Sequence, residues 1–182
     1  AGVQWVRQPQ PMLLVMTSAN PGGEPLVIDD EEALTRLNGI ADAFLTHNRR
    51  IVGRCDDSVV IAGHRPCFVR RARGFTPRAI RLTDTSPTVL AVGAFLKNTV
   101  CVTRGNEAFV SQHIGDLDDR NTLAFQEESI EWLCRMLEVN PALVVHDLHP
   151  DMPSTQLAIE IASKKSIPTL AVQHHHAHVA AV

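Results

Sequence analysis

The residues best suited to chemistry lie near the end of the sequence, where four of the nine residues from His174 to Val182 are histidines. His174 and His178 are four residues apart, so a helix in this stretch would place both imidazoles on one face, one turn apart. Two imidazoles in that geometry can bind one divalent metal ion, and such a site needs further ligands. The preceding stretch "HDLHPD" offers His146, Asp147, His149 and Asp151. The alternative is a cluster of hydrogen-bonded histidines at a strand end.

A second candidate site is the turn-rich stretch "TSANPGGEP". Thr17 and Ser18 offer hydroxyl groups, Asn20 offers an amide, and Gly22 and Gly23 let a ligand approach the backbone. A loop of this kind after a buried strand can bind a phosphate or an acyl group through backbone N–H donors. The loop alone favours the alternative, which is a plain polar turn.

Positive charge gathers in a third stretch, "FVRRARGFTPR". Arg70, Arg71, Arg73 and Arg78 follow Ser58 and create a local basic surface. Guanidinium groups suit phosphate oxygens, because their donors form a planar fork. Taken alone, the stretch favours a solvated basic face, and contact with RNA or tRNA is a weaker interpretation.

The fourth candidate, "VGAFLKNTVCV", combines a predicted strand, a tight turn with Lys97, Asn98 and Thr99, and a second strand. In some nucleotide-binding folds a hairpin of this kind holds a phosphate, and Lys97 would act on it as a point charge. An ordinary surface hairpin is an equal alternative. In the following "SQHIGDLDD", the aspartates would either orient a cation or cap the next helix.

The bulk composition excludes several classes of protein. The chain has 182 residues, 45% of them hydrophobic, and a net charge of −3, so it carries no strong field that favours nucleic acid or an anionic membrane surface. Its longest apolar runs are far shorter than a membrane span. The four scattered cysteines predict reduced thiols in a cytoplasmic protein. The chain lacks a signal peptide and an initiator Met, so we expect a fragment of a longer protein.

The elements that must position these residues follow from the hydrophobic pattern. In the first half, "MLLVM" at 12–16 predicts a buried strand. The acidic run at 29–32 predicts the start of a helix, whose apolar residues continue at helical spacing as far as Phe44. Residues 58–62 and 67–71 predict two strands joined by the turn "GHRP".

The polar segment 83–87, "TDTSP", predicts a linker, and the pattern after it is strand-strand-strand-helix-strand-helix-strand. The expected elements are strands at 89–94, 99–103 and 107–111, a helix from 121 or 122 to 138, a strand at 142–145, a helix capped by Ser154 or Thr155, and a strand at 169–172. A hairpin turn at 104–106 joins the second strand to the third. The last two strands bracket one helix and are therefore expected to be parallel. Ligands gather at the carboxyl ends of such strands, where "DLHPD" and "QHHHAH" lie.

Seven stretches occur in an order that resembles one known family. They are "VMTSANPGGEPLV", "HNRRIVGRCDDSVV", "RRARGFTPRAI", "VGAFLKNTVCV", "SQHIGDLDD", "VVHDLHPDMPST" and "VQHHHAHVAAV". Together they closely resemble HypF, the carbamoyltransferase family of NiFe-hydrogenase maturation. The resemblance covers almost all of the chain from about Pro11 onward.

The resemblance implies an α/β chain in two pieces. Residues 1–82 resemble the C-terminal part of a YrdC-like domain, which binds ATP and forms an acyl-adenylate, and 83–87 would be the linker. Residues 88–182 resemble the first lobe of a TsaD-like domain of the actin/hexokinase (ASKHA) type, with a mixed sheet. The family's acylphosphatase-like domain, its zinc finger, the front of its YrdC-like domain and its second TsaD-like lobe have no counterpart here. Each site would then be a half-site, and the fragment alone is expected to be inactive.

In the family, the carbamate released from carbamoyl phosphate is adenylated with ATP. The carbamoyl group then passes to the C-terminal cysteine of HypE and becomes a cyanide ligand of the hydrogenase. The matching nucleotide-facing positions are Thr17, Ser18, Asn20, Ser58, Arg71 and Arg73. Lys97 matches the first phosphate hairpin, and His174 and His178 match the metal-binding pair. Fixed cations stabilise the charge that builds on phosphate oxygens, so Lys97, Arg71 and Arg73 are the expected catalytic residues.

The resemblance also implies cofactors and partners: ATP with Mg²⁺, a divalent iron or zinc ion, carbamoyl phosphate and HypE, without membrane or nucleic acid. Two other functions stay open. One is threonylcarbamoyladenosine synthesis on tRNA, which also uses YrdC-like and TsaD-like domains. The other is a non-catalytic metal-binding module. "HDLHPDMPST" and the fusion of both domain types in one chain favour the hydrogenase branch.

Overall fold

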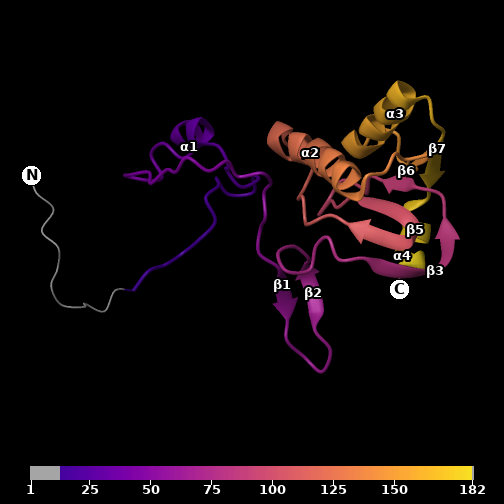
Figure 1. Ribbon diagram of the computed structural model, residues 1–182, viewed down its shortest axis with the longest axis horizontal. Coiled ribbons are helices and arrows are strands. Elements are labelled where there is room, and N and C mark those ends of the chain that lie inside the picture. The colour runs from indigo at the N-terminus through magenta and orange to yellow at the C-terminus, as the bar shows by residue number, and fades with distance from the viewer. Residues whose placement is uncertain (1–12, 182) are drawn as a thin grey trace, which may run out of the picture.

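The computed structural model describes residues 13–181 and shows a mixed α/β chain with two sheets (Figure 1). The larger sheet has five strands in the order β3-β5-β4-β6-β7. Its strands are β3 (Ile80–Ser86), β4 (Val89–Ala91), β5 (Cys101–Val110), β6 (Leu143–Asp147) and β7 (Thr169–Val172). Strands β4, β6 and β7 run parallel, and β3 and β4 are antiparallel to β5. The predicted parallel pairing of the last two strands is therefore confirmed.

Strand β5 folds back on itself. The amide of Ser111 donates to the carbonyl of Val100 over 2.8 Å, and the amide of Ile114 donates to the carbonyl of Asn98 over 2.9 Å. A straight strand would hold residues 100 and 111 about 35 Å apart, so the chain must reverse near Gly105, whose φ is 62°. This reversal confirms the hairpin predicted from the sequence.

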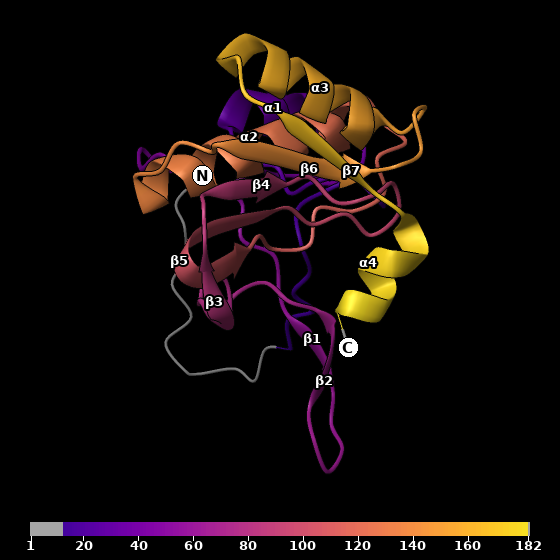
Figure 2. The ribbon, with the colours of Figure 1, turned by 90° about the vertical axis from the view of Figure 1, so that its right-hand side faces the viewer.

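Helices α2 (Arg120–Leu137) and α3 (Pro153–Lys165) lie on one face of the larger sheet (Figures 1 and 2). The core between them is mostly aliphatic and includes Leu90, Val102, Leu133 and Val144, all fully buried. The α2 bounds agree with the prediction to within two residues. The predicted cap of α3 is wrong: Met152 precedes the helix and Pro153 occupies its first turn. Ser154 and Thr155 are buried inside that turn instead.

The first half of the chain contains a short helix, α1 (Asp30–Arg36), and an antiparallel pair, β1 (Val59–Ile61) with β2 (Cys67–Arg70). The pair confirms the two predicted strands and projects away from the larger sheet (Figure 1). Helix α1 starts after Asp29, as predicted, but it ends at Arg36, long before Phe44, and Leu37 is its C-cap. Beyond the cap, Gly39 adopts a non-helical φ of 81°. Among the described residues, no helix is long and apolar enough to cross a membrane.

Two other predictions for the first half fail in their local structure. Residues 13–16 of the predicted strand 12–16 are extended without strand pairing and exposed, and Met12 lies outside the described residues. The polar segment 83–87 is mostly strand, because Ile80–Ser86 pairs with β5. Whether a domain boundary lies there stays a prediction.

The first half contacts the second through Arg54. Its guanidinium donates to the carbonyl of Leu26 over 2.7 Å, forms an ion pair with Glu128 on α2, and lies 5.5 Å from the centre of the Phe125 ring. The amide side chain of Gln112 adds a second link, since it donates to the Arg54 carbonyl and accepts from the Asp56 amide. These contacts tie the segment that follows the "TSANPGGEP" loop to the middle of α2.

Candidate functional site

Helix α4 (His174–Ala180) begins two residues after β7 and brings the two candidate metal ligands together. The side chain of Gln173 caps this helix by accepting from the amides of His175 and His176. The Nε2 atoms of His174 and His178 are 3.2 Å apart, and their ring centres are 4.8 Å apart. Both rings are therefore on one face of α4, and His175 is not part of the pair.

The separation of the two Nε2 atoms suits a shared metal ion. A zinc ion bonds to imidazole nitrogen at about 2.0–2.1 Å. An ion at about 2.1 Å from both nitrogens would therefore see them at roughly 100°, between octahedral and tetrahedral angles. Within residues 13–181 no group of three or more His, Cys, Asp or Glu could hold a metal. The pair thus offers two ligands of a site rather than a complete one.

The residues of "HDLHPD" do not join the pair as further ligands. Asp147 ends β6, and its Oδ2 lies 2.7 Å from Nδ1 of His174, on the side of the ring away from Nε2. His149 accepts the amide of Asp151 on its Nδ1, and His146 places its Nδ1 2.7 Å from the Asp147 carbonyl. Asp147 therefore supports a histidine instead of ligating beside it.

Asp147 is the only one of these four residues that is buried, with 7% of its side chain exposed. Burial works against its ionised form, but the His149 amide and the His174 ring donate to the carboxylate. The net effect holds the pKa of Asp147 below its usual value. The group is therefore a carboxylate at neutral pH.

Lys97 lies at the tip of the turn between β4 and β5, exposed and with a left-handed φ of 50°. Its amide donates to Oδ1 of Asp116 over 2.7 Å. The next residue, Asn98, is buried and donates from Nδ2 to the carbonyls of Val92 and Ala94. The turn is therefore fixed from inside while the Lys97 ammonium faces solvent, as a phosphate contact requires.

Two residues that fix this turn, one of them on α2, were missed in the sequence. Gln126 on α2 is fully buried and donates from Nε2 to the Val92 carbonyl and to Oδ1 of Asn98. Gly93 has a φ of 71°, and a Cβ there would lie 2.5 Å from the Thr99 carbonyl oxygen. The sequence did offer one signal. Gln126 is polar, yet it lies four residues before Ile130 and seven before Leu133, which is the spacing of residues on the buried face of a helix.

In the first loop, the three predicted residues differ in their surroundings. Asn20 closes the loop by donating from Nδ2 to the carbonyls of Pro21 and Glu24. Thr17 and Ser18 are exposed. Asn20 lines a cavity of about 130 Å³, together with Gly23 and residues from "SQHIG", including Gly115. The loop thus has an open space beside it, bounded by both halves of the chain.

Ser58, Arg71 and Arg73 form a group of their own at the base of the β1–β2 pair. The Ser58 hydroxyl donates to the Arg73 carbonyl and accepts the Ala72 amide. Arg71 donates from Nη2 to the Arg78 carbonyl, and its Nη1 is buried without a hydrogen-bond partner among the described residues. Burial, and next the charge of Arg78, lower the pKa of Arg71. Arg73 is exposed and donates to the Cys55 carbonyl.

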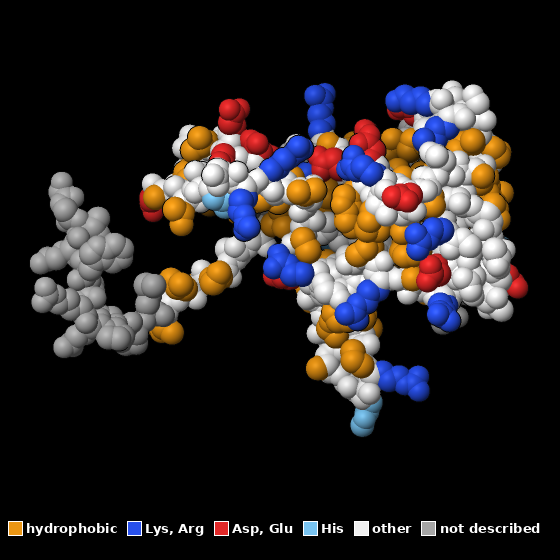
Figure 3. All heavy atoms as spheres, in the orientation of Figure 1, with side chains coloured by type: hydrophobic (Ala, Val, Ile, Leu, Met, Phe, Trp, Pro, Cys, Tyr) orange, Lys and Arg blue, Asp and Glu red, His pale blue; other side chains and the backbone are white. Residues whose placement is uncertain are grey.

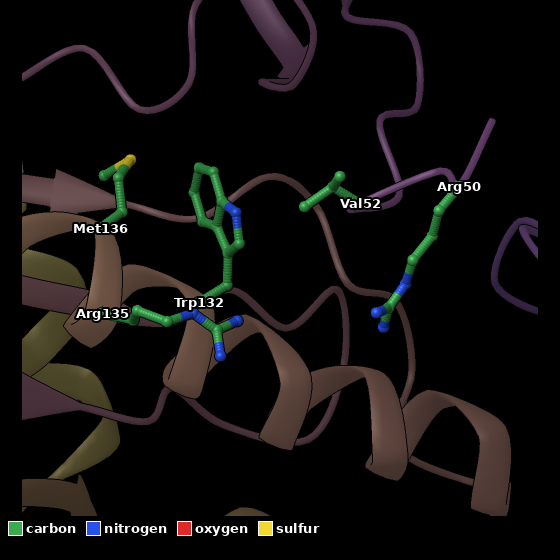
Figure 4. Close-up of a pocket in the computed structure, with 5 residues that line it drawn as sticks. All are labelled: Arg50, Val52, Trp132, Arg135 and Met136. Carbon is green, nitrogen blue, oxygen red and sulfur yellow. The ribbon is translucent and has the colours of Figure 1, made fainter.

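The structure does not bring the predicted residues into one cavity. The 130 Å³ cavity is lined by neither Ser58, Arg71 and Arg73 nor Lys97. A larger cavity of about 380 Å³ lies elsewhere, between the segment at 50–52 and helix α2 (Figure 4). Trp132, Arg135 and Met136 line it from α2, and Val52 and Arg50 face them from the segment. None of these residues was predicted to be functional.

Two family models match the chain. The model of the HypF Kae1-like domain matches residues 84–182, and the Sua5/YciO/YrdC model, described as telomere recombination, matches residues 3–72. The order of the two matches agrees with the order of the domain types that the sequence resembles.

Individual relatives give the same result. The chain is 58% identical to carbamoyltransferase HypF2 of Cupriavidus necator over 100% of its own length, and 54% identical to carbamoyltransferase HypF of Rhizobium leguminosarum over 93%. It spans only 23% and 22% of those relatives. Among solved structures, a full-length HypF in a phosphate- and nucleotide-bound form is 45% identical, with a TM-score of 0.81 over 90% of this chain and 26% of that one. HypF of T. kodakarensis is 41% identical, with a TM-score of 0.83 over 91% of this chain and 22% of that one.

Proposed function

Because the chain belongs to the HypF family of carbamoyltransferases, we propose that it forms the junction between an adenylating unit and a carbamoyl-transferring unit of one enzyme. The single observation that carries the proposal is the identity of 58% to a carbamoyltransferase along the whole chain. The enzyme uses carbamoyl phosphate and ATP, and its acceptor is the C-terminal cysteine of HypE. The chain holds part of each unit and has no activity alone.

The first half handles the adenylate. A related structure holds phosphate and nucleotide, which supports a nucleotide site in the family. In this chain the support comes from the Asn20 loop with its adjacent cavity, and from Arg71, whose buried Nη1 lacks a partner among the described residues. An unpaired buried guanidinium nitrogen is costly, and a phosphate oxygen would satisfy it. ATP binds with Mg²⁺, and Ser58 and Arg73 flank Arg71 in a group beside, and not within, the Asn20 cavity.

The second half transfers the carbamoyl group. Lys97 contacts a phosphate, and His174 and His178 hold a divalent iron or zinc ion. The metal supplies a Lewis acid for a carbamoyl or phosphate oxygen. In the transfer step the HypE thiolate forms a C–S bond to the carbamoyl carbon, and the C–O bond to the adenylate breaks so that AMP leaves with its electron pair. The enzyme works in the cytoplasm, where the four free cysteines of this chain stay reduced.

An exchange assay on the full-length protein tests this proposal. Labelled pyrophosphate should enter ATP only when carbamoyl phosphate is present, and Asn20→Ala should slow the exchange at least tenfold. Lys97→Ala should leave the exchange intact and slow carbamoylation of HypE. Exchange that requires threonine and bicarbonate in place of carbamoyl phosphate would contradict the proposal and favour tRNA modification. Absence of any ATP binding, measured by calorimetry, would instead favour a metal-binding module.

A further inference from the structure

We propose that Asp147 is a positioning residue that fixes the tautomer and the orientation of His174, so that the Nε2 lone pair of His174 faces the metal position. This inference rests on the metal pair of the proposed function. It concerns a residue that the sequence suggested only as a possible direct ligand. The structure assigns it a different role.

The tautomer follows from the hydrogen bond between the two residues. Oδ2 of Asp147 lies 2.7 Å from Nδ1 of His174. An ionised carboxylate only accepts hydrogen bonds, so Nδ1 must carry the proton. A neutral imidazole has one such proton, and Nε2 is then left as a lone pair. That nitrogen faces Nε2 of His178 at 3.2 Å.

The carboxylate is itself held in place, which a positioning role requires. Its Oδ1 accepts the amide of His149 over 2.9 Å, and the Asp147 carbonyl accepts the hydroxyl of Thr155 over 3.2 Å. In the sheet, Asp147 pairs with Val172, two residues before His174. The side chain is 7% exposed, whereas that of His174 is 45% exposed. A rigid, buried acceptor thus orients a ring that is otherwise half in solvent.

The same geometry argues against Asp147 as a ligand. Oδ1 is occupied by the His149 amide and Oδ2 by the His174 ring. The carboxylate contacts the Nδ1 side of the His174 ring, whereas His174 and His178 approach each other through their Nε2 atoms on the other side. Histidine ligands of metals commonly donate their second ring N–H to a carboxylate in this way, and loss of such a partner costs about 10- to 100-fold in metal affinity.

The test is metal affinity in the full-length protein, with Zn²⁺ competed against a chromogenic chelator and Co²⁺ absorption as the spectroscopic signature. Asp147→Asn should weaken Zn²⁺ binding about 10- to 100-fold and change the Co²⁺ spectrum. Asp151→Asn is the matched control, because this exposed carboxylate makes no side-chain contact with the pair in the described structure. It should leave both measurements unchanged.

Gln173→Ala separates positioning from a merely structural role, since it removes the cap of α4 without touching Asp147. It should weaken binding much less than Asp147→Asn. Equal loss in both variants would overturn the inference, and so would an unchanged affinity in Asp147→Asn while His174→Ala abolishes binding. If neither His174→Ala nor His178→Ala alters binding, it is the proposed metal pair that fails.

Discussion

Asp119 shows how one side chain sets the start of an element that supports the site. It precedes α2, and its Oδ1 accepts the amides of Asn121 and Thr122 over 2.7 and 3.1 Å. Burial opposes its ionisation, but these bonds, that of the Thr122 hydroxyl and the charge of Arg36 keep the pKa of Asp119 below its usual value. The carboxylate therefore stabilises the folded state wherever it is ionised.

We expect Asp119→Ala to lower the free energy of unfolding by about 1 kcal/mol, the common cost of losing such a cap. Asp119→Asn, which keeps an accepting oxygen, should cost less. The pKa of Asp119 is lower in the folded state than in the unfolded state. The difference in unfolding free energy between the native protein and Asp119→Asn is therefore complete above the unfolded pKa of about 4. It is lost as the pH falls through the lower folded pKa. Urea denaturation between pH 7 and 3 measures this difference. A gap that widens on acidification would contradict it.

At the scale of single residues, the sequence predicts which side chains share a helix face better than it predicts which distant side chains they contact. The spacing of His174 and His178 is enough to expect one helix face, because helical geometry is local. The role of Asp147 is not local, since it depends on β6 and β7 lying side by side with Asp147 opposite Val172. Thr17 and Ser18 likewise match a motif, but their exposure depends on what packs against the loop.

At the scale of elements, the turn between β4 and β5 holds the predicted site residue Lys97 on a constrained backbone. Asn98 and Gln126 bind its carbonyls from inside, and Gly93 fits only because it lacks a Cβ. The Lys97 side chain is thereby presented from a stiff turn. This arrangement suits a charge that must meet a phosphate in a fixed place.

Gly93→Ala should destabilise the protein by about 2 kcal/mol or more, because it adds left-handed backbone strain to a clash at 2.5 Å with a backbone oxygen. Gly22→Ala is the control, since a Cβ there meets nothing within 4 Å. Its effect should stay within about 0.5 kcal/mol. Thermal unfolding of both variants measures the difference, and equal melting temperatures would show that the turn is not constrained as described.

Elements with strong local periodicity were predictable, and those that depend on distant partners were not. Helix α2 and the strands β6 and β7 match their predicted ranges closely. The predicted strand at 12–16 fails over its described residues because a strand needs a neighbour to pair with, and none of the described strands pairs with 13–16. The segment 83–87 has linker composition, yet most of it belongs to β3, which pairs with β5 at Ile80, Arg81 and Ser86.

Across the whole molecule, burial is uneven. The core of the five-stranded sheet contains fully buried residues such as Leu90 and Val144, whereas Val59, Val60 and Ile61 on β1 are 40–61% exposed. Figure 3 shows hydrophobic side chains on the surface of the projecting β1–β2 pair. The fold class and the family were accessible from the sequence, but this difference in packing required coordinates.

We expect hydrogen exchange to divide the chain accordingly. A two-stranded pair with little buried surface opens easily, so the amides of β1 and β2 should exchange orders of magnitude faster than those of β4 and β6. Mass spectrometry of peptides from a time course of deuteration measures both groups in one sample. Equal protection would show that the described packing of β1 and β2 is incomplete.

The alignment of β6 with β7 has a consequence for insertions and deletions. Successive side chains of a strand alternate between the two sides of a sheet, so a slip by one position would turn the chain that follows Val172 to the opposite side. The imidazole of His174 would then leave its carboxylate partner although no site residue had been altered. Loss of a single amino acid from the connection between Lys165 and Thr169 would therefore disturb the metal site that we propose, from a distance. Length variation in that connection should be tolerated only where a second change restores the alignment.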